Sequence, residues 1–130
     1  MQVVNAMTAN LVTINADSTV AKAKMLMEAG RFRRLPVVDN DQLIGIISER
    51  DLREHLGRLE LTYARAIMKN PVITVGPDDS VEEAARIMLK RKIGGLPVLQ
   101  QGRLVGIVTY SDLLSALLRV LEATRRIMEP

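Results

Sequence analysis

Two matching stretches of sequence limit what this chain can fold into more than any other feature. Met7 and Met68 align at an offset of 61 positions, and the offset holds without a gap as far as Leu52 and Leu113. The identical pairs fall on residues that usually mark the starts, ends and cores of secondary structure. They include Thr13/Thr74, Asp17/Asp78, Val20/Val81, Met27/Met88, Pro36/Pro97, Gly45/Gly106 and Asp51/Asp112. We therefore predict two copies of one small unit, residues 1–61 and residues 62–130.

Each copy is predicted to begin with a short strand and a helix. The β-rich runs 11–14 and 72–75 predict the strands. Apolar residues then recur at helical spacing. We expect the helices to begin after Thr19 and Ser80, whose hydroxyls can accept a hydrogen bond from a free amide of the first turn. Glu83 follows Ser80 at the spacing of a capping box, which predicts that its carboxylate reaches back to the cap.

A hairpin and a second helix complete each copy. In both copies a polar turn separates two apolar runs, which is typical of antiparallel strands. The predicted strands are residues 35–38 with 43–47, and residues 96–99 with 104–108. A second helix is expected after Ser48 and after Thr109, and the last one extends from Ser111 towards Ile127.

The predicted fold class is α/β, with two β-α-β-β-α repeats. Residues 54–67 form the connection, in which residues 59–66 look helical, and residues 1–6 form a lead-in strand or strap. A unit of this size has difficulty burying a full core, so we expect the two repeats to pack as one unit.

Composition removes most catalytic and metal chemistry. The 130 residues include no cysteine and one histidine, His55, which we expect to be exposed. Disulfides, thiolate nucleophiles, cysteine zinc sites and Cys–His pairs are therefore excluded. The sequence also lacks a glycine-rich phosphate loop ending in Lys. We predict that the chain has no enzymatic activity and requires no cofactor.

Charge and hydropathy restrict the partners. The formal net charge is +3 and the pI is about 9.6, but the chain has one Phe, two Tyr and no Trp. A protein that stacks single-stranded bases would carry more aromatic side chains, so nucleic-acid binding is an alternative that only the pI favours. No apolar run approaches the ~20 residues that span a bilayer, and no basic leader follows Met1. We expect a cytoplasmic protein without a membrane partner.

The repeated motifs resemble a known family. The stretches 7–8, 11–14, 34–39 and 45–52, repeated at 68, 72–75, 95–98 and 106–113, are similar to a pair of CBS repeats, also called a Bateman module. The resemblance implies one pseudo-two-fold module with two clefts between its halves. Many family members bind AMP, ATP or other adenosyl compounds in such clefts. It also implies a regulatory role and a homodimer formed through helices.

The Gly-x-x-Ser/Thr-x-x-Asp pattern carries the candidate ligand chemistry. Ser48 and Thr109 end a strand and open a helix, where a hydroxyl and free amides can face a phosphate or ribose oxygen. Asp51 and Asp112 follow three residues later, and a carboxylate there can accept hydrogen bonds from ribose hydroxyls. The same pattern also describes an ordinary helix cap, and the two interpretations are compatible.

The resemblance adds further candidates for ligand contacts: Thr13, Arg33, Arg34, Pro36, Arg50, Thr74 and Pro97. Thr13 and Thr74 are equally well explained as exposed strand residues. Guanidinium groups suit phosphate, but the positions that match Arg33 and Arg34 in the second repeat are Gly94 and Gly95. The resemblance also implies that each cleft borrows residues from both repeats, so that Arg33 and Arg34 would join the cleft of Asp112. We therefore expect unequal clefts, with the cleft of Asp112 the tighter one.

Two function classes remain beside the adenine-nucleotide sensor. One is an oligomerisation scaffold with vestigial clefts, which Gly94 and Gly95 slightly favour. The other is the nucleic-acid binder. The sequence names neither the nucleotide nor the regulated protein partner.

Overall fold

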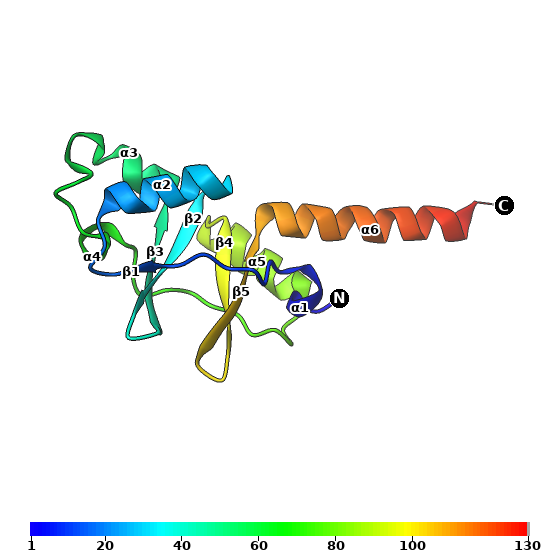
Figure 1. The fold of residues 1–130 in the computed structure, drawn as a ribbon. Coiled ribbons are helices and arrows are strands. Elements are labelled where there is room, and N and C mark those ends of the chain that lie inside the picture. The colour runs from blue at the N-terminus through cyan, green and yellow to red at the C-terminus, as the bar shows by residue number, and fades with distance from the viewer. Residues whose placement is uncertain (130) are drawn as a thin grey trace. The chain divides into compact units, whose positions relative to one another are not determined.

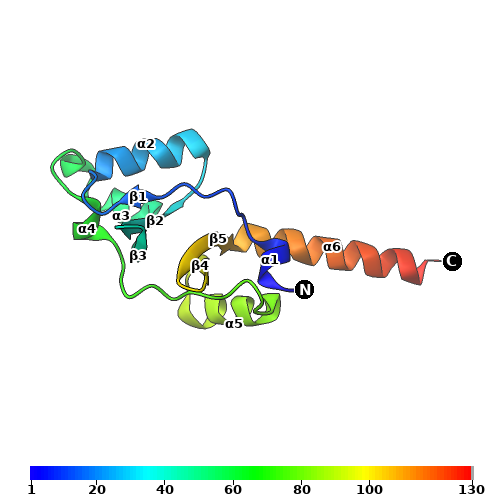
Figure 2. The same cartoon turned by 60° about the horizontal axis from the view of Figure 1, so that its bottom comes forward.

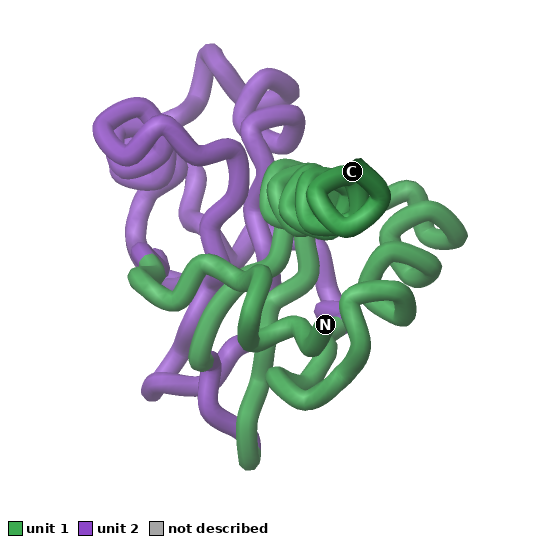
Figure 3. The backbone as a smooth tube through the Cα atoms, turned by 90° about the vertical axis from the view of Figure 1, so that its right-hand side faces the viewer, with its two compact units in different colours: residues 1–11, 74–101, 105–130 green, residues 12–73, 102–104 purple. Residues whose placement is uncertain are grey.

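The computed structural model describes residues 1–129 and divides the chain into two compact units, coloured separately in Figure 3. Unit 2 contains residues 12–73 and 102–104. Unit 1 contains residues 1–11 and 74–101 and the chain from residue 105 onward. Both units combine helices with β-strands, as the sequence predicts.

Unit 2 is built on a three-stranded sheet. Its elements in chain order are β1 Ile14–Asn15, α2 Val20–Gly30, β2 Arg34–Asp39, β3 Gln42–Ser48, α3 Glu49–Arg53, a 3-10 turn Leu56–Arg58 and α4 Ala64–Ile67. The sheet order is β1-β2-β3, with β1 parallel to β2 and β2 antiparallel to β3. Helices α2 and α3 pack on each other and on the sheet (Figure 1).

The core of unit 2 lies between these helices and the strands. Helix α2 contributes Val20, Ala23 and Met27, which share one face, and β2 contributes Leu35 and Val37. Burial of each larger apolar side chain stabilises the fold by about 1.5–3 kcal/mol. This packing fixes the start of α3, where the first repeat places its candidate ligand residues.

Unit 1 repeats the pattern with fewer paired strand residues. Its elements are α1 Val3–Ala6, α5 Val81–Arg91, β4 Gly95–Gln100, β5 Arg103–Thr109 and α6 Tyr110–Met128. Strands β4 and β5 pair with each other, and Val75 forms a single parallel bridge to Val98. Figure 2 shows α6 as one uninterrupted helix, which confirms the predicted run from residue 111 to 127.

Three local predictions need correction. Only Ile14 and Asn15 form the first strand, which ends where the Asn15 side chain accepts the Asp17 amide at 2.9 Å. Residues 72–74 form no strand at all. The lead-in at residues 1–6 contains a short helix instead of a strand.

The stretch 59–66 is helical only from Ala64 onward. The carbonyl oxygen of Leu59 accepts the amide of Ala21 at 2.9 Å, and that of Thr62 accepts the amide of Val20 at 2.8 Å. Both amides belong to the first turn of α2, which has no partner for them inside the helix. The connection forms turns here instead of a helix, and its Leu59 and Thr62 carbonyl groups cap α2.

The predicted cap at Ser80 is confirmed, but the predicted reach of Glu83 is not. Ser80 accepts the Glu83 amide at 3.0 Å. The Glu83 carboxylate contacts Arg86 at 3.4 Å instead, one helical turn further along. The antiparallel bridge between Ser80 and Gln2 uses neighbouring groups: the Val81 amide donates to the carbonyl oxygen of Met1 at 3.0 Å, and the Val3 amide donates to that of Asp79 at 2.8 Å.

The two sequence repeats exchange their lead-in segments, which we define as residues 1–8 and 62–69. In unit 2 the lead-in 62–69 forms backbone hydrogen bonds to the first repeat. In unit 1 the lead-in 1–8 forms the equivalent bonds to the second repeat. The bridges between Lys69 and Ile46 and between Thr8 and Ile107 occupy matching positions. The division at residue 61 therefore describes the sequence repeat, whereas each compact unit combines parts of both repeats.

A glycine stands beside each of these bridges. A Cβ at Gly45 would lie 2.4 Å from Met68 Sδ and 2.9 Å from Met68 Cβ. A Cβ at Gly106 would lie 2.6 Å from Met7 Sδ and 3.0 Å from the carbonyl oxygen of Thr8. The glycines are therefore needed because the lead-in backbone passes directly over them.

We expect Gly45→Ala to lower the free energy of unfolding by about 1–3 kcal/mol, because the new methyl group overpacks against Met68. Gly57→Ala is the matched control, since a Cβ added at Gly57 would meet no neighbouring atom within 4 Å. The control should be neutral or stabilising by up to about 1 kcal/mol. Urea unfolding of the two variants measures the difference, and equal stabilities would contradict the close approach.

Candidate functional site

Ser48 and Asp51 form a closed hydrogen-bond pair at the start of α3. Asp51 Oδ2 accepts the backbone amide of Ser48 at 2.8 Å and the Ser48 hydroxyl at 3.0 Å. The Ser48 hydroxyl oxygen in turn accepts the Asp51 amide at 3.3 Å. This is a capping box, and it holds the buried Asp51 carboxylate in one orientation.

Thr109 and Asp112 repeat this geometry at the start of α6. Asp112 Oδ2 accepts the Thr109 amide at 2.9 Å and the Thr109 hydroxyl at 3.1 Å. Asp112 is half-buried, whereas the side chain of Asp51 is 6% exposed. The structure therefore confirms both predicted caps, and each cap leaves the second oxygen of the carboxylate, Oδ1, outside the capping box.

The lead-in segments supply a partner to each Oδ1 atom. Lys69 Nζ lies 3.6 Å from Asp51 Oδ1. The Thr8 hydroxyl donates to Asp112 Oδ1 at 3.2 Å. We name these groups the Asp51 cluster (Ser48, Asp51 and Lys69) and the Asp112 cluster (Thr8, Thr109 and Asp112). Each lies wholly within one compact unit.

Sequence reasoning did not predict the contacts of Thr8 and Lys69. The signal was available, because the two residues match at the 61-residue offset and directly follow the paired methionines. What the sequence did not reveal is that each lead-in folds against the body of the other repeat.

The remaining candidates of the first repeat lie at different places in unit 2. Arg34 opens β2 directly opposite Ser48 in the strand register, so it is near the Asp51 cluster. Arg33 is exposed and lies 3.9 Å from Glu49. Thr13 precedes β1, Arg50 is exposed on α3, and Pro36 is fully buried.

In unit 1 the second repeat shows the same backbone frame. Thr74 precedes Val75, whose amide donates to the carbonyl oxygen of the fully buried Pro97 at 3.1 Å. The carbonyl oxygen of Gly94 accepts the Tyr110 amide at 3.1 Å, as that of Arg33 accepts the Glu49 amide in unit 2. The glycine thus preserves the backbone contact without a cation.

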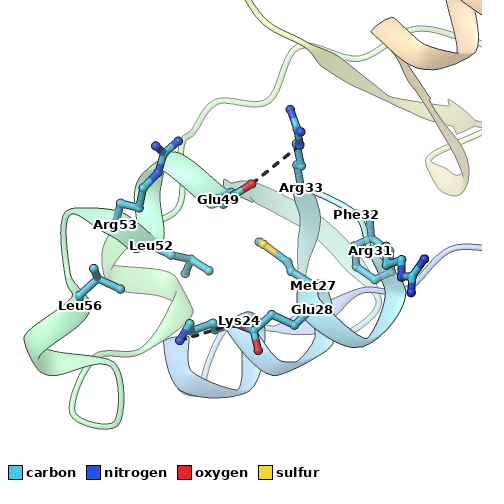
Figure 4. Close-up of a pocket in the computed structure, with 10 residues that line it drawn as sticks. All are labelled: Lys24, Met27, Glu28, Arg31, Phe32, Arg33, Glu49, Leu52, Arg53 and Leu56. Atoms are coloured by element: carbon cyan, nitrogen blue, oxygen red, sulfur yellow. Dashed lines mark ion pairs between the residues drawn. The ribbon is translucent and has the colours of Figure 1, made fainter.

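A groove between α2 and α3 is lined by other residues than those of the Asp51 cluster. It has a volume of about 330 Å³ (Figure 4). Its lining is apolar at Met27, Leu52 and Leu56 and charged at its rim, where Arg33 lies beside Glu49. Of the residues that the sequence nominates for ligand contacts, only Arg33 lines it.

Two further polar residues, Arg65 and His55, make contacts within unit 2. Arg65 contacts Asp39 at 2.9 Å and Asp17 at 3.4 Å, and its hydrogen bond to Asp39 is the main cause that raises the pKa of Arg65 above its ordinary value. His55, expected to be exposed, is half-buried because its Nδ1 lies 3.1 Å from the carbonyl oxygen of Asp51.

Among residues 1–129, no group of three or more His, Cys, Asp or Glu residues is placed so that it could hold a metal ion. Within the same residues no helix is long and apolar enough to cross a membrane.

Comparisons with known proteins agree with the repeat. A family model described as a CBS domain matches residues 3–58 and again residues 64–119. A CBS domain-containing protein of Dictyostelium discoideum is 44% identical over 131 residues, which cover 89% of this chain and 90% of that protein. Other relatives are longer, and the chain spans 34%, 31% and 21% of three of them.

Two crystal structures of similar chains contain adenosyl ligands. The CBS domain pair of protein MJ0100, in complex with 5′-methylthioadenosine and S-adenosyl-L-methionine, is 28% identical, with a TM-score of 0.83 over 90% of this chain and 95% of that one. CBSX2 in complex with AMP is 28% identical, with a TM-score of 0.82 over 92% of this chain and 97% of that one.

The double role of each carboxylate leads to a stability prediction. Asp51→Ala removes the acceptor of two hydrogen bonds from Ser48 and leaves Lys69 without its ion-pair partner. We expect a loss of about 1–3 kcal/mol in the free energy of unfolding. Asp51→Asn keeps one oxygen for the cap and should lose less than half as much. Thermal unfolding without added ligand tests this, and equal losses for both variants would contradict the capping role.

Proposed function

The chain belongs to the CBS-domain family, and on that premise we propose that it is a regulatory module that binds an adenine nucleotide or another adenosyl compound. The observation that carries the proposal is the pair of preorganised carboxylates, Asp51 and Asp112. Each is fixed by its cap through Oδ2, and its Oδ1 atom lies beside a lead-in side chain, Lys69 or Thr8. A carboxylate oxygen held in this way is a suitable acceptor for a ribose hydroxyl, since its orientation requires no further ordering.

The chemistry of the surrounding residues supports the same ligand class. The amides at the start of α3 and α6 and the hydroxyls of Ser48 and Thr109 suit sugar and phosphate oxygens. Arg34 lies opposite Ser48 and would supply a guanidinium group to a phosphate. For the remaining candidates, Thr13, Arg33, Pro36, Arg50, Thr74 and Pro97, we propose ligand contacts only as the family resemblance implies them.

The proposed mechanism is regulation by binding and not catalysis. A ligand changes the balance between two arrangements of a protein only if it binds one of them more tightly. A partner protein that binds the two arrangements with different affinity then responds to the ligand, and the size of the response is limited by the difference in ligand-binding free energy. Neither carboxylate needs to exchange a proton for this role, and we propose no enzymatic activity and no required cofactor.

We also propose that the chain forms a homodimer through α6. Leu114, Leu117, Leu118 and Leu121 recur at helical spacing, and their side chains are between 51% and 62% exposed. A stripe of this kind loses water favourably when it packs against another apolar surface. A two-fold dimer would bury the same stripe on both copies.

The ligand proposal predicts which compounds stabilise the protein. AMP, ADP, ATP or 5′-methylthioadenosine should raise the melting temperature, and CMP should raise it less, because the flat purine suits an apolar site better than a pyrimidine does. Binding at a hundredfold excess over Kd adds about 2.7 kcal/mol, which corresponds to several degrees. Differential scanning fluorimetry measures the shifts, with Asp112→Asn as the variant expected to reduce them.

Two results would favour the alternatives. Shifts that are absent for every nucleotide would indicate a scaffold with vestigial clefts. Binding to DNA or RNA that falls steeply with salt would indicate the nucleic-acid binder.

The dimer proposal predicts the effect of a charge on α6. Leu118→Asp places a carboxylate in the centre of the apolar stripe and should convert the dimer to a monomer of 14.4 kDa. Ser115→Asp introduces the same charge at an exposed position of the same helix and should leave the dimer intact. Light scattering at micromolar concentration distinguishes the two, and a monomeric unmodified chain would refute the dimer.

A further inference from the structure

We propose that Lys69 makes the Asp51 cluster selective for adenosyl compounds that carry a phosphate, whereas the Asp112 cluster also accepts phosphate-free ones. The inference rests on the proposed function, and it assigns a ligand class to each cluster. It starts from a difference in charge between the two groups, since the residue beside Oδ1 is a lysine in one cluster and a threonine in the other. Lys69 and Thr8 occupy equivalent positions in the two lead-ins, and each contacts the Oδ1 atom of its carboxylate.

In the Asp51 cluster the contact is an ion pair between unequal partners. The Asp51 side chain is 6% exposed and is held by its cap, while the Lys69 side chain is 71% exposed. Lys69 is therefore the partner that moves when a ligand arrives. Its backbone stays in place, because the Lys69 amide and carbonyl pair with Ile46 at 2.9 and 3.2 Å.

A neutral ribose hydroxyl is a poor substitute for that ammonium group. If the hydroxyl takes Oδ1, a nearly buried carboxylate loses its cation, and the hydroxyl does not replace the lost charge. A ligand that also carries a phosphate compensates for this loss, because the displaced ammonium group gains a new anionic partner. The flexible four-carbon stem and three donors of Lys69 suit this transfer from one anion to the other.

The Asp112 cluster imposes no such requirement. The Thr8 side chain is neutral, so its displacement from Oδ1 uncovers no charge. A hydroxyl can also rotate and accept a hydrogen bond from the arriving ribose while the carboxylate accepts another. Adenosine and adenosyl compounds without phosphate therefore meet no electrostatic cost at this cluster.

Arg34 is the other cation that the strand register brings near the Asp51 cluster, opposite Ser48. It can contribute to phosphate binding through its guanidinium group. The selectivity against neutral ligands is assigned to Lys69 because Lys69 is the cation that holds Oδ1, the oxygen that the ribose needs.

The test exchanges the two lead-in residues and measures the ratio of AMP to adenosine affinity by calorimetry. In the Asp112→Asn background only the Asp51 cluster retains its carboxylate, and AMP should bind at least about tenfold more tightly than adenosine. Adding Lys69→Thr should reduce this ratio to within about threefold, with adenosine binding more tightly than before. In the Asp51→Asn background, Thr8→Lys should raise the ratio at the Asp112 cluster from near one to about tenfold.

Lys24→Thr is the matched control. It removes the same charge from an exposed lysine that pairs with Glu28 on α2, and it should leave both ratios unchanged. Urea unfolding of every variant confirms that the fold is retained. If both exchanges leave the ratio of AMP to adenosine affinity within about twofold of that of their background variant, the role of Lys69 is overturned. AMP binding would still uphold the proposed function in that case. If the unmodified chain binds neither AMP nor adenosine, the proposed function fails, and this inference fails with it.

Discussion

The pairing of each lead-in segment with the strand that it crosses is the interaction on which the rest of the structure depends. Two backbone hydrogen bonds join Lys69 to Ile46, and two more join Thr8 to Ile107. The neighbouring glycines permit the close approach, because any side chain at Gly45 or Gly106 would collide with a methionine of the lead-in. The pairing sets where the lead-in side chains project, and so determines which chemical group each carboxylate contacts.

In the proposed role, the side chain of each capped carboxylate would serve the fold and a ligand together. Asp51 and Asp112 each use one oxygen to satisfy amides that a helix start would otherwise leave free. The orientation of the other oxygen is then fixed by the fold. A ligand that uses this oxygen gains from an arrangement already made during folding, since little conformational entropy remains to be lost. The choice between a helix cap and a binding residue is therefore not a real alternative here.

The sequence predicted the repeated parts of the structure because they depend on local patterns. The hairpins, the caps at Thr19 and Ser80 and the long last helix follow from apolar periodicity and from residues that start or end elements. The short first strand and the non-helical stretch before Ala64 were not predictable in this way. Residues 59–63 carry a helical pattern, but the carbonyl groups of Leu59 and Thr62 accept amides of α2 that lie far away in the sequence.

The candidate site followed the same division between local and distant contacts. Ser48, Asp51, Thr109 and Asp112 could be found from the repeated motif alone, because the motif contains its own hydrogen bonds. Lys69 and Thr8 contact the carboxylates only through the exchange of lead-ins, and the sequence carries no signal for that exchange.

The exchange of lead-ins also has a consequence for the order in which the chain can fold during synthesis. The first-repeat partners of the segment 62–69 all precede it in the sequence, so this lead-in can dock as soon as it leaves the ribosome. The segment 1–8 is made first, yet the second-repeat groups that form backbone hydrogen bonds to it lie between residues 77 and 107. Thr8 must remain unpaired until Ile107 has been added, and closure over so long a stretch of chain is slow. Translation therefore favours unit 2 as the first unit to close, with the amino terminus waiting for the second.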